Sequence, residues 1–137
     1  MAREAEPLRR EVGARAQSRC EYCLYPEARS AFWHQVDHII SRKHGGGSSL
    51  DNLAFCCVFC NRYKGSDIAA IDTRTGEIVR LFHPRLDRWS DHFRLAGAII
   101  EPLTLKGEVT ARLPRFNQAE RVAERALLQA TGYPLRR

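Results

Sequence analysis

The chain has 137 residues, of which 44% are apolar and 28% are charged, with a formal net charge of +6 and a pI near 9.4. This composition is typical of one globular domain and excludes an intrinsically disordered chain. No apolar run approaches the about 18 residues of a membrane span, and the charged N-terminus lacks the apolar stretch of a secretory signal, so we expect a cytoplasmic protein without membrane contact.

The first predicted element is a short helix at residues 7–18. Pro7 suits a first helical position, and Leu8, Val12 and Ala16 recur at helical spacing. The helix leads directly into the first pair of cysteines.

Further predicted elements alternate between apolar runs and a polar loop. Residues 31–40 have the apolar and aromatic character of a strand. Residues 41–52 are predicted as a loop, because three consecutive glycines and two serines do not fit a regular element. A second apolar run at 52–57 predicts a short strand, and we expect a helix over residues 61–71.

The second half of the sequence predicts turns and short strands. A turn at Thr75–Gly76 precedes an apolar run at residues 78–82. Residues 98–113 look like a hairpin around Lys106–Gly107, with alternating apolar residues on its far arm.

A terminal helix is predicted after Asn117. Asn117 and Glu120 have the spacing of a capping box, and Gly132 is a natural stop. The helical stripe that we expect to face the core consists of Val122, Ala123, Ala126, Leu127 and Ala130.

Two cysteine pairs have the same spacing: Cys20 with Cys23, and Cys57 with Cys60. Each spacing lets two thiolates of one turn bind the same ion, and the two turns complete the four-sulfur site of a structural zinc ion. Buried unliganded cysteines and a redox dithiol are the alternatives, but neither explains two matched pairs. Cys56 lies in an apolar run, where a cysteine usually packs as a small buried hydrophobe, so we expect it in the core.

Polar residues of a second kind lie between and beside the cysteine pairs. Asp37 and His38 end the predicted strand, and Asn61 directly follows the last cysteine. Carboxylate and amide oxygens suit Mg²⁺ or Mn²⁺, and an imidazole suits a general base at neutral pH. A histidine with a purely structural role is the alternative.

Residues 36–65, with the cysteine pair upstream, resemble the HNH endonuclease family and its ββα-metal fold. The first motif histidine falls on His38, and the metal-binding acid before it falls on Asp37. The central asparagine falls on Asn52. The third position falls on Asn61, where many members have histidine, so this would be an HNN variant.

The resemblance implies an α+β fold, in which a small ββα-metal (HNH) module is stapled by the four-cysteine zinc site. It implies that His38 is the general base, that Asp37 and Asn61 bind a catalytic Mg²⁺ or Mn²⁺, and that the Asn52 amide holds the loop and orients His38. The catalytic set is therefore His38, Asn52 and Asn61. Basic residues gather nearby, which favours a polyanionic partner over an unspecific basic surface. The expected nucleic-acid contacts are Arg42, Lys43, Arg62 and Lys64.

We expect an N-terminal helix at 1–19, the nuclease core at 20–67, and an extension at 68–137. The extension would supply a hairpin and a helix packed on the core within the same domain. The expected function is metal-dependent hydrolysis of phosphodiester bonds in DNA. The alternative is a non-catalytic, zinc-dependent nucleic-acid-binding module. Double-strand cutting by one active site would require a homodimer or two sequential nicks.

Overall fold

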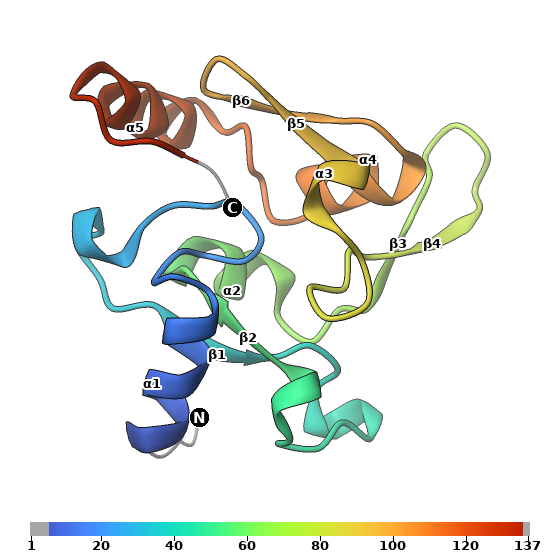
Figure 1. The fold of residues 1–137 in the computed structure, drawn as a ribbon. Helices are drawn as coiled ribbons and strands as arrows, with labels where there is room; N and C mark the ends of the chain where they lie inside the picture. The colour runs from blue at the N-terminus through green and yellow to red at the C-terminus, as the bar shows by residue number, and fades with distance from the viewer. Residues whose placement is uncertain (1–5, 136–137) are drawn as a thin grey trace.

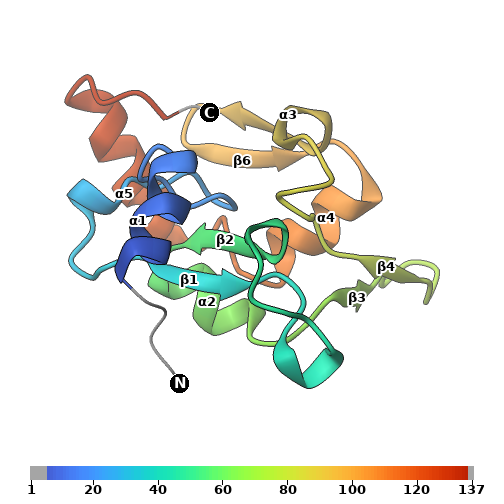
Figure 2. The same cartoon turned by 60° about the horizontal axis from the view of Figure 1, so that its bottom comes forward.

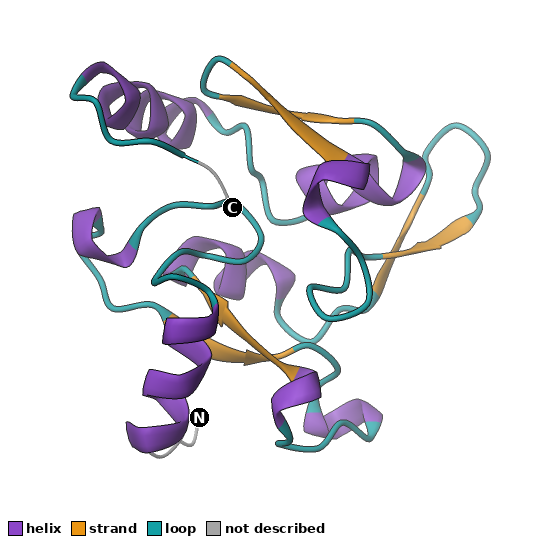
Figure 3. Cartoon of the chain, viewed as in Figure 1, coloured by secondary structure: helices purple, strands orange, loops and turns teal. Residues whose placement is uncertain are grey.

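The structure is a computed structural model that describes residues 6–135, so the outermost parts of the expected 1–19 and 68–137 segments lie outside the described residues. Within this range, three two-stranded antiparallel sheets alternate with helices, which confirms the α+β class (Figures 1 and 3). The α-helices are α1 (Glu6–Arg15), α2 (Val58–Lys64), α3 (Trp89–His92), α4 (Leu105–Arg112) and α5 (Ala119–Ala130). Short 3-10 turns are η1 (Glu27–Arg29), η2 (Arg42–His44) and η3 (Leu50–Asn52). The strands are β1 (Gln35–His38), β2 (Leu53–Cys56), β3 (Ala69–Ile71), β4 (Ile78–Arg80), β5 (Phe93–Ala96) and β6 (Ile99–Pro102).

The strands β1 and β2 and the helix α2 form the expected ββα unit. The two strands are antiparallel, and Gln35 lies opposite Cys56 while His38 lies opposite Leu53. The helix α1 contacts both strands, and α2 contacts β1, as Figure 2 shows. Val12 of α1 packs with Leu53 and other buried residues of the hairpin, so the apolar face of α1 covers the sheet.

Two helix boundaries in this part differ from the expectation. The first helix ends at Arg15, because Gln17 and Ser18 adopt φ values of 56° and 58°, which no helix contains. The second helix is short, since it ends at Lys64 and residues 69–71 form β3 instead of more helix. Its terminal Gly65 has a φ of 53°.

The expected hairpin around Lys106–Gly107 is wrong. These residues belong to α4, and the hairpin is formed by β5 and β6. The Thr104 hydroxyl caps α4 by accepting the backbone N–H of Gly107 at 3.0 Å. A Cβ on Gly107 would lie 2.3 Å from the backbone oxygen of His92, so the glycine marks a close approach of two segments and not a turn.

The terminal helix exists, but its inward face is not the apolar stripe. Its buried residues are Arg121, Arg125 and Leu128, whereas Leu127 of the expected stripe is 66% exposed. The capping box is also wrong. The Asn117 side chain bonds the backbone N–H and C=O of residue 100 instead of capping the helix.

One hydrophobic cluster joins the ββα unit to the extension. Tyr22 and Ile39 share it with Phe82 and Phe93, and the Phe82 and Phe93 rings lie 5.5 Å apart. The Trp89 indole N–H also donates to the Tyr22 carbonyl at 2.8 Å. The extension therefore supplies core, as expected for a module that buries little apolar surface alone. Among the described residues, every helix is too short or too polar to cross a membrane.

Candidate functional site

The two predicted cysteine pairs meet in one buried cluster. The Sγ atoms of Cys20, Cys23, Cys57 and Cys60 all lie within 4.8 Å of one another, and those of Cys23 and Cys57 are 3.7 Å apart. Four sulfurs at about 2.3 Å from one tetrahedral ion would be about 3.8 Å apart. The cluster therefore fits a structural zinc ion, and the predicted ligand set is confirmed as a possible zinc site.

The backbone conformation of each turn directs its two cysteine sulfurs toward the centre of the four-sulfur cluster. In the first turn the backbone N–H of Cys23 donates to Cys20 Sγ at 3.4 Å, and Leu24 closes the turn with a φ of 70°. In the second, the backbone N–H of Cys60 donates to Cys57 Sγ at 3.4 Å, so that Cys57 also caps α2. The same spacing thus makes two equivalent N–H···S turns.

Cys56 is not a member of this cluster, as predicted. It is fully buried in the hydrophobic core at the end of β2. Burial raises the pKa of the Cys56 thiol well above its usual range, and the neighbouring cysteines raise it further. Cys56 therefore behaves as a core residue.

His38 lies half-buried at the end of β1, next to the loop that follows the strand. Its Nε2 lies 2.9 Å from the Ser48 hydroxyl, to which Arg42 also donates at 3.0 Å. Because side chains alternate along a strand, His38 shares the face of Val36, which packs toward α1. Asp37 points to the opposite face, toward α2.

Asn52 clamps the loop between the two strands. Its Oδ1 accepts the backbone N–H of Ile40 at 2.9 Å, while its Nδ2 donates to the carbonyls of Ile40 and Gly47 at 2.9 and 2.7 Å. A Cβ on Gly46 would lie 1.7 Å from the Ile40 carbonyl oxygen, so this close approach requires glycine. These are bonds to the loop backbone of the kind that the resemblance assigned to Asn52.

Asp37 is buried in an ion pair with Lys64. Its Oδ2 accepts the Tyr22 hydroxyl at 3.0 Å and lies 3.2 Å from Lys64 Nζ, which also donates to the Ile39 carbonyl at 3.3 Å. Burial raises the pKa of Asp37, although Lys64 and the Tyr22 hydroxyl oppose the rise. Sequence reasoning missed both partners, because neither spacing nor composition relates residues 22, 37 and 64.

The placement of Lys64 corrects its expected role. The side chain is 2% exposed and its ammonium faces Asp37, so it does not offer a surface contact for phosphate. The other three basic residues of the expected set, Arg42, Lys43 and Arg62, are exposed. They lie on η2 and α2, which flank the strand β1.

Asn61 lies on the helix face toward β1. Its Nδ2 donates to Oε1 of Gln35, a partner that sequence reasoning did not identify. Gln35 and Asp37 are two residues apart on one strand and share a face. The structure thus brings Asn61 and Asp37 to the same side of β1, each with a partner on the opposite element.

A further charged residue reaches the cysteine cluster from outside the predicted site. Arg121 of α5 donates to Cys60 Sγ at 3.0 Å and to Cys57 Sγ at 3.7 Å. It was predicted neither as buried nor as a site residue, because the helical pattern placed its apolar neighbours inside. Only the tertiary structure connects it with the cysteines.

Comparison with protein-family models gave a match to the model "HNH endonuclease" over residues 20–67. Searches of curated proteins and of solved structures returned no match. The matched range begins at the first cysteine of the four-sulfur cluster and includes the ββα unit with His38, Asn52 and Asn61. Residues 20–67 of this chain therefore match the HNH endonuclease model, in agreement with the resemblance seen in the sequence.

Proposed function

We propose that the protein is a metal-dependent endonuclease that hydrolyses phosphodiester bonds in DNA. The observation that carries the proposal is the position of His38 inside the HNH segment. It ends β1 half-exposed, beside a loop that Asn52 clamps and next to the exposed Arg42. A histidine in this position can reach both solvent and a bound phosphate.

In the proposed reaction, His38 is the general base. Its imidazole removes a proton from a water molecule, and the resulting hydroxide attacks the phosphorus atom. The Ser48 hydroxyl contacts Nε2 and orients the ring. Asn52 fixes the loop that carries Ser48, so it is a positioning residue for His38.

The donor atoms of Asp37 and Asn61 fit the proposed Mg²⁺ or Mn²⁺ by their chemistry, since both side chains offer hard oxygen ligands. Both described contacts of Asp37 reach Oδ2, which leaves Oδ1 as the candidate ligand atom. Such an ion, when bound, would stabilise the leaving oxygen of the phosphodiester. Lys64 would hold the Asp37 carboxylate in place.

We assign DNA contacts to Arg42, Lys43 and Arg62. All three are exposed, and each neutralised phosphate would release a counterion, which makes binding sensitive to salt. Nicks in each strand, or a homodimer with two such sites, would produce a double-strand break.

A specific observation favours the second candidate, a non-catalytic zinc-dependent nucleic-acid-binding module. Asp37 is paired with Lys64, and the Asn61 amide is bonded to Gln35. Side chains that already have such partners could have a purely structural role. The two candidates share DNA binding and differ in hydrolysis.

The distinguishing experiment uses zinc-loaded wild-type protein and supercoiled plasmid. We expect nicked or linear plasmid after addition of Mg²⁺ or Mn²⁺, and intact plasmid when the divalent ion is omitted. The ion is omitted instead of chelated, because a chelator would also strip the cysteine cluster. A gel shift of the same DNA without cleavage in either ion would reject the nuclease and support the binding module.

A further inference from the structure

We propose that Arg121 completes the four-sulfur site by donating hydrogen bonds to its thiolates, and that it thereby couples zinc binding to the docking of α5. This inference concerns the cysteine cluster and not the proposed cleavage of DNA. It assigns a role to a residue outside the 20–67 family match.

Arg121 is held rigidly against the sulfurs. It is 6% exposed, and its second guanidinium nitrogen, Nη1, donates to the carbonyls of Pro114 and Arg115 at 2.6 and 3.1 Å. Its Nη2 is the group that reaches Cys60 and Cys57. The backbone carbonyls thus orient the guanidinium so that the remaining donors face sulfur.

The negative charge of a four-thiolate site explains why an arginine lies beside the four sulfurs. Four thiolates around one Zn²⁺ leave a net charge of about −2 in a buried site, which is unfavourable without compensation. Arginine stays protonated even in a buried site, and the Arg121 guanidinium contacts Cys60 and Cys57 directly. The guanidinium is therefore a permanent cation beside the sulfurs.

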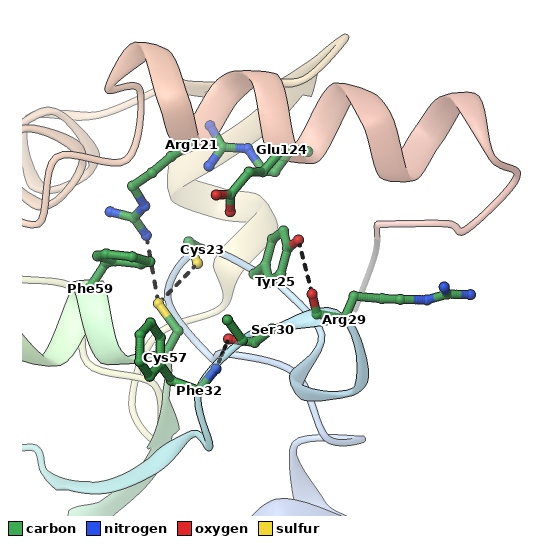
Figure 4. Close-up of a pocket in the computed structure, with 11 residues that line it drawn as sticks. Cys23, Tyr25, Arg29, Ser30, Phe32, Cys57, Phe59, Arg121 and Glu124 are labelled. Atoms are coloured by element: carbon green, nitrogen blue, oxygen red, sulfur yellow. Dashed lines mark hydrogen bonds between the residues drawn. The ribbon is translucent and has the colours of Figure 1, made fainter.

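Apolar packing does not by itself fix α5 to the domain. Its inward face consists of two arginines and Leu128. Figure 4 shows Arg121 and Glu124 of this helix above Cys23 and Cys57. These four residues contribute to the lining of a cavity of about 240 Å³. Aromatic residues line that cavity, namely Tyr25, Phe32 and Phe59. Because this cavity leaves part of the helix without close packing, the docking of α5 depends more on its buried polar contacts than on its apolar contact area.

The second buried arginine of α5 provides a matched control. Arg125 is 1% exposed, and it donates to the carbonyls of Ala98 and Phe116, each at 2.8 Å, and to Asn117 Oδ1 at 3.1 Å. These partners all lie within the extension. Arg125 thus anchors α5 to the extension, and Arg121 anchors it to the cysteine cluster.

The test compares Arg121→Met with Arg125→Met in the full-length, zinc-loaded protein. We expect Arg121→Met to transfer zinc to a chromogenic chelator about 10–100-fold faster than wild type, because partners of metal ligands contribute to metal affinity on that scale. Arg125→Met should transfer zinc at close to the wild-type rate. With Co²⁺ in place of zinc, the sulfur-to-cobalt absorption band should shift in Arg121→Met alone.

A second readout follows the helix itself. Amide hydrogen exchange in α5 should be faster in zinc-loaded Arg121→Met than in zinc-loaded wild type. Arg121→Lys keeps the charge but not the planar guanidinium fork, so its rates of zinc transfer and of amide exchange should lie between those of wild type and Arg121→Met. If Arg121→Met does not fold, Arg121→Lys takes its place in the test. The inference would be overturned if Arg121→Met had the same rate of zinc transfer and the same cobalt spectrum as wild type. If only Arg121→Lys folds, the same result for that variant would overturn it. None of these readouts involves DNA, so the outcome is independent of the proposed nuclease activity.

Discussion

Replacing Cys57 with serine, or removing the zinc ion, is expected to unfold the domain. Structural zinc binding contributes about 10–16 kcal/mol of folding free energy at neutral pH. A whole domain is stable by only about 5–15 kcal/mol. The fold here consists of three two-stranded sheets, which are marginal on their own, and the buried cysteines lie in the cluster that joins the β1–β2 sheet to the β5–β6 sheet. Far-ultraviolet circular dichroism and zinc content would both be lost.

The neighbouring cysteine supplies the control. Cys56→Ala removes a buried sulfur that lies outside the four-sulfur cluster, so the variant should fold, retain zinc, and lose about 0.5–3 kcal/mol, as is typical of core substitutions. Retention of zinc by Cys57→Ser together with its loss from Cys56→Ala would show that the ligand set is wrong.

The second large effect is expected for Lys64→Met. Removing one partner of a buried ion pair leaves an uncompensated charge, which costs about 3–5 kcal/mol. Asp37 would be that charge, since its carboxylate is 5% exposed and Lys64 Nζ is its cationic contact. Urea unfolding of the zinc-loaded protein measures the loss. Arg62→Met, an exposed position on the same helix, should change stability by no more than about 0.5 kcal/mol.

The loss of folding free energy in Lys64→Met should also depend on pH. Burial already raises the pKa of Asp37, so the folded state takes up a proton at a higher pH than the unfolded chain does. As pH falls into that range, the folded variant gains stability relative to the wild type, because a protonated Asp37 no longer needs a cation. Comparing both proteins at each pH removes the shared effect of thiolate protonation. If the loss of stability in Lys64→Met is independent of pH, or equal to that of Arg62→Met, then Lys64 and Asp37 are not energetically coupled.

The sequence was sufficient to predict the parts of the structure that depend on local spacing. The two cysteine pairs each form a turn within four residues, so their spacing alone indicated one metal site. The strand that ends at His38 and the glycine-rich loop after it are likewise local features. These features together also carried the resemblance to the HNH family.

The features that the sequence did not reveal depend on contacts between distant segments. Gly107 looked like a turn residue, but it is needed because the backbone of His92 passes close by. Arg121 was not predicted to be buried, but its partners are sulfurs of another segment. Lys64 looked like a phosphate contact, but it pairs with Asp37. In each case the residue type permits two environments, and only tertiary packing selects between them.

Plasmid cleavage by wild type and by His38→Ala tests the central claim most directly. Both proteins would be zinc-loaded and assayed with Mg²⁺ or Mn²⁺, and His44→Ala, an exposed position in η2, is the matched control. Loss of a general base should slow cleavage by about 10²–10⁴-fold, while zinc content and circular dichroism stay unchanged. Cleavage by His38→Ala at the rate of wild type and His44→Ala would contradict the assignment of His38 as the catalytic base.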